Sequence, residues 1–437
     1  MVEAGAWGPM ANGGLGRRWP RRALALLSAG AVAYAAAIGS VATLAVQAVS
    51  ENIELLSVGG LDLAQDGKPL HVLVVGSDER GNLTRAEREA LSLGDFDGAR
   101  SDTVILLTVA ADRSNVSLVS MPRDLVVGDT DGGIAKLTET FADGRDELVR
   151  AVTEDLGFPV NHYIEVSITG FMQTVEVVGS VQICLDEPLR DRKAGANFEA
   201  GCQEMDPQES LAYVRSRQGG LGDFERIERQ QTFLRALLGR VIDAQLLLDP
   251  GRMLTIANEV SQQIATDDTL TVTRMVRLAQ DLRGAVGGDI EMLTVPGYTK
   301  GLNDSGVTKS FIVPYGPGLA ALLDDVRNGR DPATRGTAEE RAETTVGVWT
   351  GGRQGAGVVE STLQWGGFVP LVLGSTQIDA GAITTVYVVP GFEAQAGYVA
   401  AHLGAPMLPL PVGVDIDQRA EVIVSVGDDA GDRSDQA

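Results

Sequence analysis

His71-Val-Leu-Val-Val-Gly-Ser-Asp-Glu-Arg80 is the stretch that decides the fold. Its apolar, β-branched run predicts a buried strand that ends at Gly76. In open α/β sheets, ligands lie beyond the carboxyl ends of the strands, so we expect Asp78 and Arg80 where a binding site would lie. Taken alone, these residues fit equally a simple loop in which Asp78 caps a helix.

A second strand is expected over Asp102–Val109, after a charged insert at residues 81–99. The insert gives the chain room to turn back, so this strand can run antiparallel to the first. That direction is required if Asp102 is to lie near Asp78, and it makes the predicted sheet a mixed one.

Short apolar runs and helical patterns continue to alternate beyond these two strands. Further strands are expected over Val116–Ser120 and Val181–Leu185, and helices over Leu148–Leu156, Thr169–Val178, Gln208–Val214, Phe224–Ala244 and Leu270–Arg283. This interleaving predicts an α/β fold with a three-layer α-β-α domain, built on a mixed central sheet, over residues 70–326.

Composition excludes some classes of protein. With 437 residues, 44% of them hydrophobic and 22% charged, the chain is long and apolar enough for two globular domains. The net charge of −23 argues against nucleic-acid binding, which normally requires a basic face. Against so acidic a background, local clusters of arginine are notable.

An N-terminal anchor is expected. Residues 23–48 carry no charge and would span roughly 39 Å as a helix, enough for a bilayer core of ~30 Å. Four arginines between residues 17 and 22 precede them, which predicts a cytoplasmic N-terminus at 1–22, a single pass through the cell membrane, a tether at 49–69 and an extracytoplasmic catalytic domain. The alternative is a secretory signal peptide, whose apolar core is normally only ~7–15 residues long.

A smaller α/β module is expected at residues 346–428, after a polar linker at 327–345 and before an acidic, disordered tail at 429–437. Its predicted elements are the strands Val346–Trp349, Val369–Leu373, Thr384–Val389 and Ala420–Val426 and the helices Gly355–Gly366 and Phe392–Leu403. A Gly-Lys-Ser/Thr ending is absent from its glycine-rich turn, which argues against nucleotide binding. Trp349, Trp365 and Tyr387 are expected in packing rather than as a sugar platform.

Cys184 and Cys202 are the only cysteines. In an exported domain they would form a disulfide that stabilises the fold by ~3 kcal/mol, the alternative being two free thiols. Their spacing and a total of three histidines argue against a zinc site.

Further arginines recur where strands and helices meet loops. Val116–Ser120 leads into Pro122-Arg-Asp124, whose proline ends the strand and directs Arg123 from its end. Guanidinium forks grip phosphate oxygens in pairs, and two carboxylates beside them can hold a divalent cation such as Mg²⁺. The pattern therefore points to pyrophosphate chemistry.

Two consecutive helices supply the other candidate residues. Asp206-Pro-Gln-Glu209 forms a capping box for the helix that ends at Arg215 and Arg217, and this helix must unwind if both arginines are to face one ligand. In the next helix, i, i+4 spacing places Arg226 and Gln230 on one face. The alternative for that face is a solvated charged surface.

Six motifs in this order carry a resemblance: HVLVVGSDER, ARSDTVILLTV, VSMPRD, KLTETFADG, YVRSR and DFERIERQQ. Together, over residues 70–245, they resemble the LytR–CpsA–Psr family of membrane-anchored bacterial enzymes of cell-wall assembly. Residues 346–427 are similar to the C-terminal LytR module of actinobacterial members.

The resemblance implies a transferase. It would move a glycopolymer from a polyprenyl diphosphate carrier to a sugar hydroxyl of peptidoglycan and release polyprenyl phosphate. Asp78 and Asp102 would hold Mg²⁺ or Mn²⁺, and Asp78 or a neighbouring carboxylate would be the base. Arg100 and Arg123 would join them in catalysis, and the diphosphate contacts implied are Arg80, Lys136, Arg215, Arg217, Arg226 and Gln230.

The chain departs from the family pattern at Thr138, which replaces an amide beside Lys136. A long apolar cleft for the lipid is expected near Phe171 and Phe233. Two other functions remain open: a non-catalytic protein that binds polyprenyl phosphate or wall polymer, and a diphosphatase. The abundance of arginine, alanine and glycine suits a high-GC actinobacterium, and arabinogalactan, teichoic acid and capsule all remain open as the polymer.

Overall fold

The computed structural model describes residues 53–78, 91, 101–218, 223–242, 259, 261–262, 264–285, 291–304, 306–351, 353, 355–373, 378 and 381–431. The predicted anchor at 23–48, Arg80 and Arg100 lie outside these residues. Among the residues described, no helix is both long and apolar enough to span a membrane.

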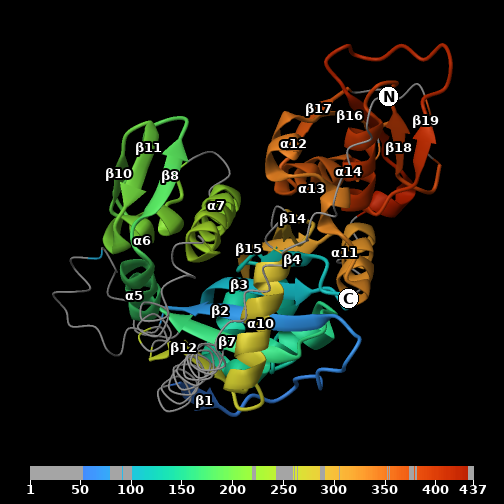
Figure 1. Ribbon diagram of the computed structural model, residues 1–437. Helices are drawn as coiled ribbons and strands as arrows, with labels where there is room; N and C mark the ends of the chain where they lie inside the picture. Colours follow the sequence, from blue (N-terminus) through green and yellow to red (C-terminus); the bar gives the residue numbers. More distant parts are fainter. Residues whose placement is uncertain are drawn as a thin grey trace, which may run out of the picture. The chain divides into compact units, whose positions relative to one another are not determined.

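A mixed sheet of seven strands forms the centre of the larger domain (Figure 1). In spatial order its strands are β1 (Glu54–Leu56), β12 (Ile264–Asp267), β7 (His162–Ser167), β2 (Leu70–Ser77), β3 (Ser101–Val109), β4 (Val116–Met121) and β13 (Glu291–Thr294). Strand β2 runs parallel to β7 and antiparallel to β3. The predicted mixed sheet and the predicted antiparallel direction of β3 are both confirmed.

Helices cover both faces of this sheet, so the predicted α-β-α layering is confirmed. Neighbouring residues of β2 point to opposite layers, because side chains alternate along a strand. Leu73 belongs to a core with Leu148 and Leu322, whereas Val72 packs in a second core with Leu278. The covering helices are α3 (Leu137–Asp143), α4 (Arg145–Arg150), which continues as a π-helix over Ala151–Asp155, α11 (Gly316–Asn328), α7 (Asp223–Ile242) and α10 (Val272–Ala285). Helix α10 crosses in front of the sheet in Figure 1.

Strand β7 is an element that sequence analysis missed. Its sequence, His162-Tyr-Ile-Glu-Val-Ser, has polar residues where a buried strand normally has aliphatic ones. The fold supplies partners for them: the Nδ1 atom of His162 lies 3.2 Å from Asp267 Oδ2, and Arg145 donates to Glu165 over 2.6 Å. Buried polar groups are tolerated when they are hydrogen-bonded, and these partners come from distant segments.

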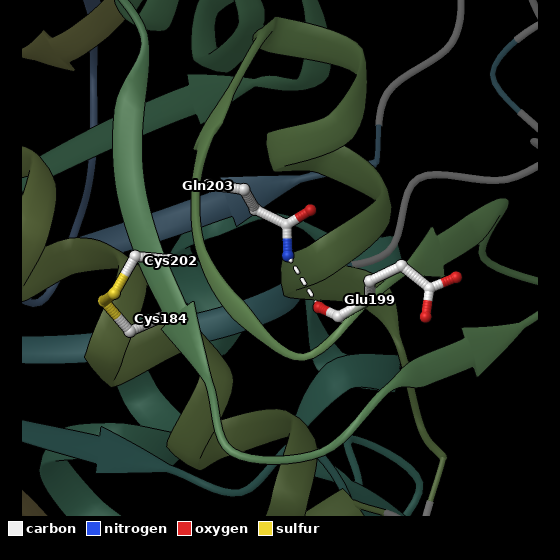
Figure 2. Close-up of a disulfide and its surroundings, with 4 residues drawn as sticks. All are labelled: Cys184, Glu199, Cys202 and Gln203. Carbon is white, nitrogen blue, oxygen red and sulfur yellow. Dashed lines mark hydrogen bonds between the residues drawn. A yellow bond between two sulfur atoms is a disulfide. The ribbon is translucent and has the colours of Figure 1, made fainter.

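A small lobe of short strands stands beside the sheet, green in Figure 1. It contains α5 (Ile168–Val178), α6 (Pro207–Arg215) and the paired strands β8 (Val181–Leu185) with β11 (Gly201–Met205) and β9 (Leu189–Asp191) with β10 (Ala196–Phe198). A disulfide joins Cys184 to Cys202 directly across the β8–β11 pair, which confirms the predicted pairing (Figure 2). Beside it, Gln203 Nε2 donates to the backbone oxygen of Glu199 over 2.9 Å.

Two hairpins complete the larger domain: β5 (Val126–Gly128) with β6 (Ile134–Lys136), and β14 (Gly297–Asp304) with β15 (Val307–Pro314). Residues 327–345, predicted as a polar linker, contain a 3-10 turn at Pro332–Arg335 and helix α12 at Ala338–Glu343. Arg335 and Arg341 within this segment are buried, with 4% and 8% of their surface exposed.

The C-terminal module is a second α/β unit, as predicted. Its five strands lie in the order β17 (Val369–Val372), β16 (Thr345–Trp349), β20 (Val422–Ser425), β18 (Thr385–Val388) and β19 (Met407–Pro409), with helices α13 (Ala356–Trp365) and α14 (Glu393–Leu403). Trp349 and Tyr387 are buried together in a core cluster, which confirms their packing role. Trp365 makes an edge-to-face contact with Phe224, 5.9 Å between ring centroids.

The C-terminus corrects one prediction. A 3-10 turn covers Asp428–Ala430, where Ala430 is buried and Asp429 Oδ1 accepts a hydrogen bond of 2.7 Å from the Thr384 backbone. The disorder predicted from residue 429 is therefore wrong for residues 429–431, because this aspartate ties the turn to β18. Residues 432–437 lie outside the described part.

Candidate functional site

A β-bulge brings the two predicted metal ligands to one place in the backbone. Gly76 of β2 pairs with Thr103 and Ser77 pairs with Ser101, so Asp102 is the extra residue on β3. A Cβ added at Gly76 would lie 3.1 Å from Thr103 Cβ, so a larger residue here would require Thr103 to shift by a few tenths of an ångström. Asp78 follows at the end of β2, one residue from the bulge. The side chain of Asp102 lies outside the described residues.

A cavity of about 700 Å³ opens at this end of the sheet. Five of the predicted site residues line it: Asp78, Arg215, Arg217, Arg226 and Gln230. They come from the end of β2, the end of α6 and the first turns of α7, segments separated by up to 152 positions along the chain between Asp78 and Gln230. The fold thus gathers these basic and acidic side chains around a single cavity.

Helix α6 presents its two arginines as the capping motif predicted. The Asp206 side chain accepts hydrogen bonds from the backbone N–H groups of Gln208 and Glu209, and the Glu209 side chain accepts one from the Asp206 backbone N–H. The helix ends at Arg215, and Ser216 is already extended, with φ −64° and ψ 140°. This confirms the predicted unwinding, which turns Arg217 away from the helical path toward the cavity.

Helix α7 contributes from a partly buried face rather than from a solvated one. Arg226 lines the cavity with only 3% of its surface exposed. Gln230 donates to the Val214 carbonyl over 3.4 Å, and Arg229 donates to the carbonyls of Ser216 and Gln218 over 2.9 and 2.6 Å. Arg229 therefore holds the segment after α6 in position instead of lining the cavity.

Arg123 and Lys136 form a separate basic cluster around Asp124. Lys136 Nζ lies 2.9 Å from Asp124 Oδ1, whereas Arg123 Nε lies 3.9 Å from the same oxygen. Neither residue is among those that line the 700 Å³ cavity. The Thr138 hydroxyl donates to the Ser101 carbonyl over 2.8 Å, and the Thr138 backbone N–H donates to the Arg123 carbonyl. Through these two hydrogen bonds of Thr138, the cluster adjoins the start of β3.

Sequence analysis missed the loop that joins β9 and β10. Arg190 and Asp191 at the end of β9 line the cavity together with Arg192 and Lys193 of the loop. Partial burial acts to raise the pKa of Asp191, but backbone N–H groups of Arg217, Ala194 and Lys193 and the Ser216 hydroxyl outweigh it and lower that pKa. The signal available in the sequence was three cationic residues within four positions of a strongly acidic chain.

The residues present fit a divalent cation held jointly with a phosphate ligand. Within the described part of the chain, no group of three or more His, Cys, Asp or Glu side chains could hold a metal alone. Mg²⁺ is commonly bound by one or two carboxylates together with substrate phosphates and waters. Asp78 at the cavity, with the backbone of Asp102 beside it, suits that arrangement.

Part of the cavity wall is apolar. Val166, Ile168, Phe171, Leu211 and Val214 line it beside the arginines. Phe171 also packs against Phe233, 5.3 Å between ring centroids, and Phe233 is buried behind it. One ligand with a charged group and an apolar chain would find complementary surfaces here.

Comparison with known proteins places these observations in a family. The model of the LytR_cpsA_psr family matches residues 33–314. The cell wall biosynthesis protein LcpA of Corynebacterium glutamicum is 28% identical over 422 residues, which cover 86% of this chain and 80% of that protein.

One further relative and one solved structure are also similar to this chain. The polyisoprenyl-teichoic acid–peptidoglycan teichoic acid transferase TagV of Bacillus subtilis is 28% identical over 242 residues, covering 53% of this chain and 57% of TagV. Among solved structures, a LytR-Csp2A-Psr enzyme from Actinomyces oris superposes with a TM-score of 0.50 at 20% identity, covering 64% of this chain and 97% of that one. This last likeness is one of fold.

Proposed function

Since the chain belongs to the LytR_cpsA_psr family, we propose that it transfers a glycopolymer from a polyprenyl diphosphate carrier to a sugar hydroxyl of peptidoglycan. Its relatives support glycopolymer transfer in cell-wall assembly, since TagV is a teichoic acid transferase and LcpA a cell wall biosynthesis protein. The function proposed here is therefore that of a phosphotransferase.

The observation that carries the proposal is the shared cavity of Asp78, Arg215, Arg217 and Arg226. Phosphoryl transfer depends mainly on positioning and on stabilising charge that develops on the phosphate oxygens. Guanidinium groups from two different helices can contact both phosphates of a diphosphate at once. The apolar wall near Phe171 supplies a surface for the first isoprene units of the carrier.

The proposed reaction is a displacement at the phosphorus that bears the glycan. The acceptor hydroxyl oxygen forms a bond to that phosphorus, and the bridging P–O bond breaks, so polyprenyl phosphate leaves. Asp78 or a neighbouring carboxylate takes the hydroxyl proton. Arg215, Arg217 and Arg226 stabilise the oxygens, and a bound Mg²⁺ or Mn²⁺ would neutralise charge on the diphosphate.

Four other predicted residues remain proposed contacts: Arg123 and Lys136, and, outside the described residues, Arg80 and Arg100. The cluster around Asp124 adjoins Ser101, the residue next to Asp102, so its charge acts close to the proposed metal ligands. Arg123 and Lys136 share the single carboxylate of Asp124, so the cluster keeps a net positive charge. Its role under this proposal is therefore electrostatic.

The proposed location is the outer side of the cell membrane, with one N-terminal helix as anchor and no nucleic-acid partner. The Cys184–Cys202 disulfide supports an oxidising compartment, since such bonds are rare in the cytosol. The uncharged sequence of residues 23–48, as the proposed anchor, would give the enzyme access to a lipid-linked donor.

Transfer is tested with the full chain in detergent, a polyprenyl diphosphate disaccharide, an acceptor glycan and Mg²⁺. We expect a phosphodiester-linked product together with polyprenyl phosphate, and loss of both when EDTA is added. Asp78→Asn should lower the rate by about 10²-fold or more, because it weakens metal binding and removes the base. Arg419→Ala is the control, since Arg419 is exposed and pairs only with nearby Asp417 among the residues described.

The two alternatives give different outcomes in the same assay. Release of glycan phosphate without a linked product would identify a diphosphatase. Tight binding of the donor with no turnover, with or without metal, would identify a binding protein and contradict the transferase.

A further inference from the structure

The loop between β9 and β10 adds positive charge to the cavity beyond the arginines of α6 and α7. Among the described residues, six cationic side chains line the cavity against two carboxylates, Asp78 and Asp191. This excess stands in a chain whose net charge is −23. A diphosphate diester carries two negative charges, one on each phosphorus, and the three positive charges of Arg215, Arg217 and Arg226 already exceed them. The loop cations therefore call for a separate ligand group.

Asp191 fixes the loop against the catalytic segment. Its Oδ2 accepts the backbone N–H of Arg217 over 2.7 Å. Its Oδ1 accepts the backbone N–H groups of Lys193 and Ala194 over 3.0 and 3.3 Å. One carboxylate thus joins the tip of the loop to the arginine segment after α6, and the loop cannot shift without moving Arg217.

The three cations of the loop differ in what they do. Arg190 is occupied within the lobe, because its guanidinium donates to the Phe198 carbonyl and to the Glu199 carboxylate. Arg192 and Lys193 are exposed at the cavity. Across the described part of the chain, neither of these two side chains has a hydrogen bond or an ion pair. Of these three cations, Arg192 and Lys193 are therefore the two that can bind a ligand.

We propose that Arg192 and Lys193 form a second anion subsite at the cavity, positioned by Asp191, for a phosphate or carboxylate group on the donor glycan. The inference rests on the proposed function and narrows its substrate class to glycopolymers that carry negative charge near the diphosphate. A group on the glycan is favoured over a membrane headgroup because the subsite and the diphosphate arginines share one cavity, and one donor molecule can reach both.

The test compares two donors that differ by one charged group. Both are short-chain polyprenyl diphosphate disaccharides, and one carries a phosphoglycerol on its second sugar. For the full-length protein in neutral detergent, we expect kcat/KM to favour the anionic donor by about tenfold, the effect of roughly 1.4 kcal/mol. The double variant R192A/K193A should bring this ratio close to one, and added salt should do the same in the wild type.

Matched variants separate charge from position. K68A/R419A removes one lysine and one arginine that are exposed outside the cavity and should keep the tenfold ratio. Asp191→Ala should lower kcat as well as the ratio, because Arg217 loses its backbone anchor, and Asp191→Asn should restore part of kcat. A merely structural role for Asp191 would lower the folded fraction and leave the kcat and ratio of the folded protein unchanged.

Three results would overturn the inference. The first is equal use of the two donors by the wild type, and the second is a loss in R192A/K193A that is the same for both donors. The third is a defect of R192A/K193A that appears only when phosphatidylglycerol is added to the detergent, which would assign the cations to lipid headgroups. If neither donor is transferred, the proposed function fails, but equilibrium binding of the same two donors still decides the subsite.

Discussion

Arginines in two regions of this molecule differ in exposure and in the contacts that they make. At the 700 Å³ cavity, Arg217 is exposed, and its backbone N–H donates a hydrogen bond of 2.7 Å to Asp191. At the junction between the larger domain and the C-terminal module, Arg335 is buried and donates to Asp325 and to the Ala401 carbonyl. Arg341, also buried, donates to the carbonyls of Gly336 and Met292.

The difference teaches how a fold assigns one residue type to two purposes. Where nearby carbonyls and carboxylates satisfy a guanidinium, it becomes a structural cross-link. Where a guanidinium lines an open cavity and is exposed, as at Arg217, it can also contact an anionic ligand. The two classes cannot be told apart by composition, since both occur beside acidic residues.

Helix α7 is shared by the two regions. Arg226 and Gln230 line the 700 Å³ cavity, whereas Glu228 and Arg235 line a second cavity of about 370 Å³ at the junction. Burial, together with the neighbouring Glu225, raises the pKa of Glu228. Gln231 anchors the helix to the sheet through Ser120 and Thr294. The C-terminal module thus packs on the back of the helix that carries two proposed substrate contacts.

The largest expected effect is on activity and falls on the cavity side. Arg217→Ala should lower the transfer rate by about 10²–10³-fold, because a preorganised donor to the phosphate oxygens is lost. Its unfolding free energy should change by less than about 0.5 kcal/mol, since the guanidinium is exposed. Steady-state kinetics and urea unfolding on one sample measure both, and a large loss of stability would contradict the contrast.

The reverse pattern is expected at the junction. Arg335→Ala should lower the unfolding free energy by about 3 kcal/mol, since it leaves part of the Asp325 charge and the Ala401 carbonyl unpaired in a buried place. Arg330 still contacts Asp325, which keeps the cost at the lower end. Urea unfolding gives the number, and kinetics at low temperature should show nearly normal turnover per folded molecule. A rate loss as large as that of Arg217→Ala would erase the distinction between the regions.

The disulfide sharpens the comparison on the cavity side. Cys184→Ser should cost about 2–3 kcal/mol, because the bond constrains the unfolded chain over a separation of 18 residues. The closed loop contains Asp191, so we also expect a higher KM for the donor. Thermal unfolding with and without a reductant tests this. Reduction should reproduce the loss in the wild type and leave Cys184→Ser unchanged.

The smallest effect concerns pH at the junction. Burial lowers the pKa of His402 from its usual 6.5 to about 3, aided by Arg335 and Arg341 and opposed by its hydrogen bond to the Thr362 carbonyl. Above pH 6.5 the imidazole is neutral in both states; below it, only the unfolded chain takes up the proton, so stability falls as pH falls. From pH 7.5 to 5.5 this group should remove about 1 kcal/mol.

Urea unfolding at the two pH values measures this loss, and His402→Gln should reduce it. His71 has a pKa lowered by burial to about 4 and contributes in the same direction from the central sheet, so His71→Gln provides the comparison. An unchanged pH profile in His402→Gln would show that the histidine does not report on the junction.

Local patterns predicted part of the regular elements, mainly the long apolar strands and the amphipathic helices. The apolar runs of β2, β3, β4 and β8 and the capping box of α6 are visible in the sequence, because strand and helix periodicity and capping are local properties. Strand β7 escaped because its polar residues are satisfied by Asp267 and Arg145, which lie far away in the chain. Long-range partners of that kind leave no local pattern.

The residues of the candidate site that lie in local motifs were predicted, and those that a long-range contact brings to the cavity were missed. Asp78, Arg215, Arg217, Arg226 and Gln230 were named from motifs, and the fold brings all five to one cavity. Arg192 and Lys193 were missed because a long-range contact holds their loop at the cavity. The backbone N–H of Arg217 donates to Asp191, which is 26 positions away in the chain.

The sequence by itself determined which chemistry is available: arginines and aspartates at the ends of strands and helices, in an order shared with one family. Tertiary structure alone decided which arginines line the cavity and which are buried and hydrogen-bonded at the junction. The physical reason is that packing decides which acceptors lie within about 3 Å of a side chain's hydrogen-bond donors. Such contacts join residues that are distant along the chain.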